Sequence, residues 1–123
     1  PLGYACTIFE ALPAPGGLMR TNIPSFRLPA AVLDEEIDAI LAMGVTVHYE
    51  TPVTSLRALL AGGWDAIFVG SGAPRGKELD LPGRRDTDRV HVGIEWLGAV
   101  HFGHVDRIGA RVLIVGVGNT AMD

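Results

Sequence analysis

The chain has 123 residues, the size of one ordinary domain, with 48% hydrophobic residues, 20% charged residues and a formal net charge of −4 at pH 7. This composition excludes a disordered or coiled-coil chain, and the negative charge argues against nucleic acid or an anionic membrane as a partner. One cysteine excludes an internal disulfide framework and an iron–sulfur cluster held by this chain alone. There is no membrane-length apolar run and no signal-peptide pattern, so we expect a cytoplasmic protein.

The first third of the chain predicts a strand, a long loop and a helix. Residues 4–9 (YACTIF) mix aromatic and β-branched side chains, which favours a strand that ends at Glu10. Proline and glycine are frequent over residues 12–29 and predict an irregular loop. Apolar residues at helical spacing predict a helix over 30–43, which Gly44 can end in the left-handed conformation.

The remaining elements alternate in the same way. We expect strands over 45–49, 65–70 and 111–115, helices over 55–61 (capped by Thr54 or Ser55) and 94–102, and loops or a short hairpin over 74–92. Alternating strands and helices, with mostly apolar strands, predict an α/β fold with a mostly parallel sheet.

Two features carry possible chemistry. The run GVGNTA, residues 116–121, places Gly-x-Gly-x-x-Ala after a predicted strand and before a helix, as in dinucleotide-binding turns. Such turns also arise for steric reasons alone. Glu10, at a strand end, is suited to accept hydrogen bonds from ribose hydroxyls, although an acid at a strand end is commonly just solvated.

A family resemblance gives these features more weight. Residues 7–29, TIFEALPAPGGLMRTNIPSFRLP, closely resemble the segment after the second strand of the FAD domain in glutamate synthase small subunits and related NADPH-dependent flavoproteins, including dihydropyrimidine dehydrogenase. Further matches follow in order: LDEEIDAILAMGV, DAIFVGSGAPRG, LPG and RVLIVGVGNTAMD. The resemblance covers nearly the whole chain.

The resemblance implies an incomplete Rossmann-like FAD/NAD(P)-binding sheet with helices on its faces. Residues 1–105 would form part of an FAD-binding domain, and residues 106–123 would begin an NAD(P)-binding domain. The implied reaction passes hydride from NADPH to FAD, and electrons then leave toward an iron–sulfur or large catalytic subunit.

The resemblance also implies residue roles. Glu10 would bind the FAD ribose and Val53 the adenine through its backbone. The loop against the FAD diphosphate and flavin would contain Gly16, Gly17, Leu18 and, with a solvated charge as the alternative, Arg20. The second flavin-side turn would contain Gly70, Gly72 and Ala73. The NADPH phosphate turn would contain Gly116, Gly118, Asn119 and Ala121.

The family's FAD domain begins with a strand and a Gly-x-Gly-x-x-Gly motif that this sequence lacks. We therefore expect this chain alone to be inactive and to bind FAD weakly. We also expect strand 111–115 to enter the slot between strands 4–9 and 65–70, within one chain or by strand exchange in a homodimer. The alternative function is a non-catalytic α/β interaction module that binds a partner subunit without a cofactor.

Other candidates have simpler structural explanations. His101, His104 and Asp106 are expected to face solvent rather than bind a metal. Cys6, inside a predicted strand, is expected to be a small buried thiol. The remaining residues are expected to pack the edge of the core (Trp64 and Trp96) or to form a solvated face (Arg75, Lys77, Arg84, Arg85 and Arg89).

Overall fold

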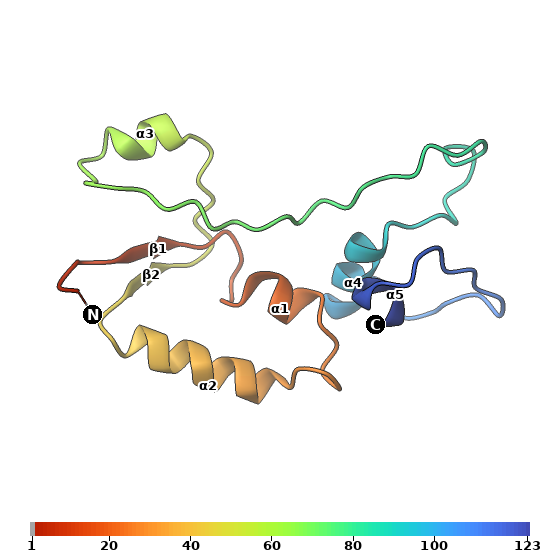
Figure 1. Ribbon diagram of the computed structural model, residues 1–123, viewed down its shortest axis with the longest axis horizontal. Coiled ribbons are helices and arrows are strands. Elements are labelled where there is room, and N and C mark those ends of the chain that lie inside the picture. The colour runs from red at the N-terminus through yellow and green to blue at the C-terminus, as the bar shows by residue number, and fades with distance from the viewer. Residues whose placement is uncertain (1) are drawn as a thin grey trace. The chain divides into compact units, whose positions relative to one another are not determined.

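The computed structural model describes residues 2–123, which form an α/β arrangement of short elements (Figure 1). In chain order these elements are β1 (Thr7–Phe9), α1 (Gly17–Thr21), α2 (Ala30–Leu41), β2 (Thr46–His48), α3 (Leu56–Leu60), α4 (Gly93–His101) and α5 (Asn119–Met122). Among the described residues, no helix has the length and apolarity needed to cross a bilayer.

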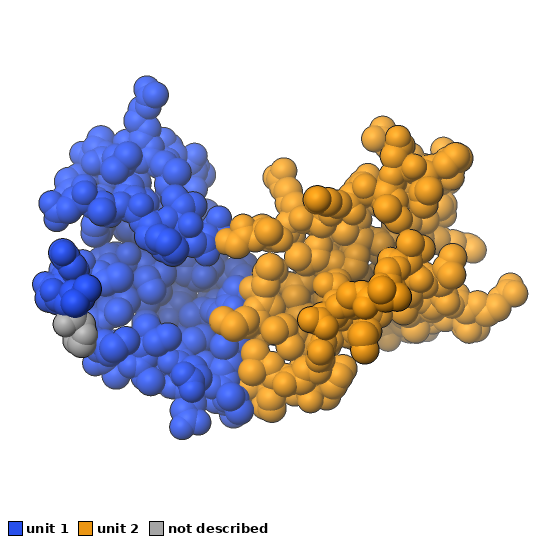
Figure 2. Space-filling model, in the orientation of Figure 1, with its two compact units in different colours: residues 1–17, 30–71 blue, residues 18–29, 72–123 orange. Residues whose placement is uncertain are grey.

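The chain divides into two compact units (Figure 2). Unit 1 contains residues 1–17 and 30–71, and unit 2 contains residues 18–29 and 72–123. The loop after β1 therefore contributes its first part to one unit and its second part to the other. The two units are groups of residues that contact one another and are distinct from the domains expected from the sequence. The domain boundary between residues 105 and 106 stays a prediction.

Unit 1 is built on a parallel pair of strands. Thr7 lies opposite Thr46, and Phe9 lies opposite His48. The rings of Phe9 and His48 stack with their centroids 5.4 Å apart. The ring of Trp64 lies edge-on to that of Phe9, with a centroid distance of 5.6 Å. The two strands run parallel, in agreement with the expected parallel character of the sheet, although each strand is shorter than the sequence pattern indicated.

The helix between these strands agrees closely with its prediction. α2 begins at Ala30, directly after Pro29, and ends at Leu41, and Gly44 adopts the expected positive φ of 94°. Among residues 2–123, Leu33 in α2 is the only hydrophobic residue that is buried, with 6% of its surface exposed. In α3, Ser55 is the N-cap, and its Oγ accepts a hydrogen bond from the Ala58 amide at 3.2 Å.

Two predicted strands are wrong. Residues 65–70 and 111–115 have no strand structure, and the expected insertion of 111–115 between 4–9 and 65–70 does not occur within the chain. Phe68 is 94% exposed and Leu113 is 88% exposed. A strand is stabilised by hydrogen bonds to a neighbour, so apolar and β-branched composition alone cannot form one.

Other corrections are local. The loop over 12–29 contains the short helix α1, which was not predicted, whereas residues 74–92 form loops, the first of the two alternatives expected there. Cys6 is exposed instead of buried, because the strand begins one residue after it. In unit 2, α4 forms one residue earlier than predicted and contacts α5, where a Cβ added at Gly93 would lie 3.1 Å from Cγ2 of Thr120.

We predict that Phe9→Ala will lower the free energy of unfolding of this chain by about 2 kcal/mol, because it removes two ring contacts and apolar area. Tyr4→Ala, at an aromatic residue that is 85% exposed, should change it by less than about 0.5 kcal/mol. Urea denaturation followed by tryptophan fluorescence measures both values. Equal effects of the two substitutions would contradict a structural role for the Phe9 ring contacts.

Candidate functional site

Glu10 lies where β1 ends, at the carboxyl edge of the parallel pair. Its backbone links the segment that follows β1 to the end of β2 and the residues after it. The Glu10 amide donates to the His48 carbonyl and the Glu10 carbonyl accepts from the Thr51 amide, both at 2.9 Å. Its side-chain Oε1 accepts a hydrogen bond from the Leu12 amide at 2.8 Å. A carboxylate can accept several hydrogen bonds, so Glu10 has the chemistry to accept one from a ribose hydroxyl as well.

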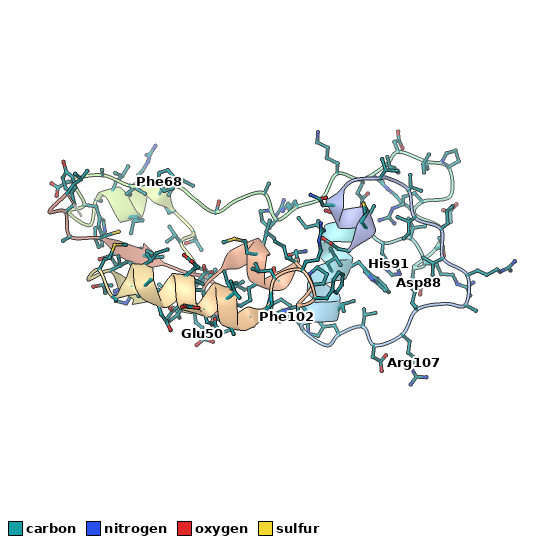
Figure 3. The ribbon with its side chains drawn as sticks, turned by 60° about the horizontal axis from the view of Figure 1, so that its bottom comes forward. Glu50, Phe68, Asp88, His91, Phe102 and Arg107 are labelled. Carbon is teal, nitrogen blue, oxygen red and sulfur yellow. The ribbon has the colours of Figure 1, made fainter. Side chains whose placement is uncertain are left out.

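Glu50 follows β2 at the same edge and was not among the predicted site residues (Figure 3). Among residues 2–123, Glu50 is the only non-glycine residue with a positive φ, which is 52° and lies in the left-handed region. The Glu50 amide donates to the Leu12 carbonyl at 3.2 Å. This hydrogen bond is a further link, beside those of Glu10, between the segments that follow β1 and β2. Backbone conformation of this kind follows from the tertiary pairing, and the sequence contains no signal for it.

The glycine pair after Glu10 has unusual backbone geometry. Gly16 and Gly17 have φ values of 114° and 49°, which side-chain-bearing residues seldom adopt. The pair turns the chain into α1, in which Leu18 and Arg20 are half-buried. A backbone without side chains at this turn can approach a diphosphate closely, which is the geometry expected of a cofactor-binding loop.

The other residues assigned to FAD lie in irregular segments. Val53 is 41% exposed and lies between β2 and α3, shortly after the Glu50 turn. Gly70, Gly72 and Ala73 follow the extended segment 65–69, and Gly72 has a φ of 69°. The structure therefore places Val53 just after β2, three residues beyond Glu50, while the turn at residues 70–73 follows a segment that has no strand partner.

The Gly-x-Gly-x-x-Ala run forms a turn that leads into a helix, as its pattern predicts. Gly116 has a φ of 131°, and a Cβ added there would lie 3.8 Å from the Ala121 Cβ. Gly118 is the N-cap of α5 with a φ of −80°, and a Cβ added there would meet nothing within 4 Å. Asn119 begins α5. The residues fit a dinucleotide turn, with a tight first glycine and open space at the second.

The predicted site residues are divided between the two units. Unit 1 holds Glu10, Gly16, Gly17, Val53 and Gly70, whereas unit 2 holds Leu18, Arg20, Gly72, Ala73, Gly116, Gly118, Asn119 and Ala121. Within unit 2, the loop that carries Leu18 and Arg20 is joined to the end of the Gly-x-Gly-x-x-Ala segment through an ion pair between Arg27 and Asp123. Neither of these two residues was predicted.

His101, His104 and Asp106 are exposed to solvent, as predicted, and the two histidines lie beside one aromatic ring. The ring centroids of His101 and His104 lie 5.0 Å and 6.0 Å from that of Phe102. Within residues 2–123, no three His, Cys, Asp or Glu side chains gather in a group suited to a metal ion.

Comparison with known proteins places the chain beside subunits of oxidoreductases. No protein family model matches it. Over 98% of its length it is 37% identical to the beta subunit of an NADPH-Fe(3+) oxidoreductase from Geobacter sulfurreducens, of which it covers 19%. It is 35% identical to the beta subunit of an NADP(+)-dependent formate dehydrogenase from Moorella thermoacetica, with 98% of the chain and 18% of the relative aligned.

A third relative is the NAD-dependent dihydropyrimidine dehydrogenase subunit PreT homolog from Salmonella typhi, which is 36% identical over 99% of the chain and 30% of the relative. The chain thus spans less than a third of each of these three proteins. Their names differ in substrate but agree in cofactor class. The chain is similar, over nearly all its length, to part of subunits of NAD(P)-dependent oxidoreductases.

Proposed function

We propose that this chain is part of a flavoprotein oxidoreductase of the glutamate synthase small-subunit type. In that protein, hydride passes from NADPH to FAD, and electrons pass on to an iron–sulfur partner. Residues 1–105 would belong to the FAD-binding domain of a Rossmann-like sheet, and residues 106–123 would begin the NAD(P)-binding domain.

The observation that carries this proposal is the position of Glu10. In dinucleotide-binding folds an acidic side chain at the carboxyl end of a parallel strand accepts hydrogen bonds from the ribose. Glu10 has this position, and Gly16 and Gly17, which follow it, have the positive φ values that allow the backbone to approach a ligand closely. The similarity to NADPH-Fe(3+) oxidoreductase and NADP(+)-dependent formate dehydrogenase subunits supports the nicotinamide half of the proposal.

This chain would contact FAD through the Glu10 side chain and through the backbone of several turns. Glu10 would accept hydrogen bonds from the ribose, and Val53 would present its backbone to the adenine. The flavin and diphosphate would lie against two turns, one made by Gly16, Gly17, Leu18 and Arg20 and the other by Gly70, Gly72 and Ala73. FAD, when bound, supplies the chemistry that accepts two electrons from a nicotinamide and releases them singly.

The second nucleotide site would be the turn before α5. Gly116 would make the tight bend, Gly118 would let the backbone approach the pyrophosphate of NADPH, and Ala121 would allow the helix to pack closely. The amide of Asn119 would face the phosphates at the start of the helix. Because the relatives are named as subunits of oxidoreductases, we propose that electrons leave this protein toward a partner subunit.

The test of the flavin site uses the complete protein that contains this chain. We predict that it binds FAD, with a shifted flavin absorbance and quenched fluorescence, and that Glu10→Gln weakens FAD binding about tenfold because a hydrogen bond to a charged group is lost. Glutamine still offers an oxygen to the Leu12 amide, so the fold is retained. Glu36→Gln, on the exposed side of α2, is the matched control and should bind FAD normally.

Failure of the complete protein to bind FAD, together with capture of a partner subunit by the cofactor-free protein, would overturn the proposal in favour of an interaction module. Unchanged FAD affinity in Glu10→Gln would remove Glu10 from the site.

The nucleotide turn gives an independent prediction. Gly118→Ala should leave the midpoint of thermal unfolding unchanged, since its φ is accessible to alanine and the added methyl meets no protein atom within 4 Å. It should raise the KM for NADPH about tenfold or more, because the methyl would occupy the space of the pyrophosphate. Anaerobic NADPH oxidation with a one-electron dye measures this, and a KM equal to that of the wild type would place the pyrophosphate elsewhere.

A further inference from the structure

The loop over residues 18–29 is held at two points within unit 2. Near its start, the Asn22 side-chain amide donates to the carbonyl of Ile94 in α4 at 2.5 Å. Near its end, the Arg27 guanidinium forms an ion pair with the carboxylate of Asp123, directly after α5. The loop therefore contacts α4 and the residue that follows α5, at positions 72 and 96 residues away in the sequence.

Both members of the ion pair are fixed by their own backbone. The amide of Arg27 donates to the Pro24 carbonyl at 2.9 Å, which closes a turn within the loop. The amide of Asp123 donates to the Asn119 carbonyl at 3.0 Å, and Asn119 immediately follows Gly118 of the nucleotide turn. A displacement of that turn would therefore shift Asp123, and through it Arg27.

This ion pair differs from those that Arg84 forms with Glu78 and Arg107 with Asp106. The Asp123 side chain is only 7% exposed, whereas the carboxylates paired with Arg84 and Arg107 are 57% and 83% exposed. Those two pairs join residues that are close in sequence, and solvent screens them. Arg27 is 40% exposed, so water screens its charge in part, but the Asp123 carboxylate has little access to water of its own and is stabilised by the contact with Arg27.

We propose that Arg27 and Asp123 are a positioning pair that couples the flavin-side loop over 18–29 to the NADPH turn at 116–121. The inference rests on the proposed function and adds residues to which that function assigns no role. The contact between α4 and α5, near Gly93 and Thr120, completes the link, because the loop contacts both α4 and the residue that directly follows α5. Nucleotide bound at the turn would then order the loop that lies against the flavin.

Hydrogen–deuterium exchange on the flavin-loaded complete protein tests the coupling, with NADP⁺ as the probe. In the wild type, NADP⁺ should slow exchange in peptides covering both 116–123 and 18–29. In Arg27→Gln and in Asp123→Asn, NADP⁺ should still slow exchange in 116–123, while its effect on 18–29 falls about tenfold. Arg84→Gln, which breaks the exposed ion pair with Glu78, is the control and should behave as the wild type.

Two further variants separate coupling from loss of structure. The charge-reversed double variant Arg27→Asp with Asp123→Arg should recover most of the NADP⁺ effect on 18–29, to within about threefold of the wild type. Arg27→Lys keeps the charge and should retain the effect to a similar degree. In steady-state assays the two neutral variants should show a kcat about tenfold lower at nearly unchanged KM for NADPH, as expected for loss of positioning.

The proposal is overturned if NADP⁺ protects residues 18–29 equally in the wild type and in both neutral variants, or if Arg27→Lys loses the effect as fully as Arg27→Gln. A wild-type protein that binds neither flavin nor NADP⁺ refutes the proposed function, and the coupling with it. Normal binding without coupling refutes only the role of this ion pair.

Discussion

The parallel ladder between β1 and β2 is the constraint on which unit 1 depends. It continues past the strands, because the Thr46 amide donates to the Cys6 carbonyl at one end and Glu10 is bonded to both His48 and Thr51 at the other. This ladder brings Glu10, Leu12 and Glu50 to one edge, although 40 residues separate the two glutamates in sequence. A parallel pair needs a long crossover, and α2 lies within it. The candidate ribose site exists at that edge because both strands end there.

The same principle explains why much of the apolar surface remains exposed. Residues 65–70 and 111–115 have strand composition but no strand neighbour, and Phe68, Leu113 and Val117 are almost fully exposed. Leu33 is the buried hydrophobic residue among the described positions. Hydrophobic stabilisation grows with the apolar area removed from water, so contacts this sparse stabilise the chain weakly. The chain spans less than a third of the three oxidoreductase subunits described above, and burial of these segments would require strands that residues 2–123 do not provide.

In unit 2 the proline-rich loop over residues 18–29 is held by side-chain contacts, since both described strands lie in unit 1. One hydrogen bond from Asn22 and one ion pair from Arg27 join the loop to α4 and to the end of α5. Long loops lose much conformational entropy on ordering, so contacts at both ends of the loop are an efficient way to restrict it. Because one of these contacts involves the residue that follows α5, the loop and the glycine turn are connected through short, hydrogen-bonded backbone segments. That connection is the physical basis for expecting the proposed NADPH turn to influence the proposed flavin-side loop.

The sequence by itself determined the features that depend on neighbouring residues: α2 with its glycine stop, a hydroxyl cap for α3 at Thr54 or Ser55, the approximate position of α4 and the helix start after Gly118. It also indicated Glu10 and the glycine turns, since their chemistry and spacing are local. Only the tertiary structure decided which apolar segments became strands, because β1 and β2 found each other while 65–70 and 111–115 did not. It alone revealed the left-handed Glu50 and the Arg27–Asp123 pair, since these arise where distant segments meet and leave no local pattern.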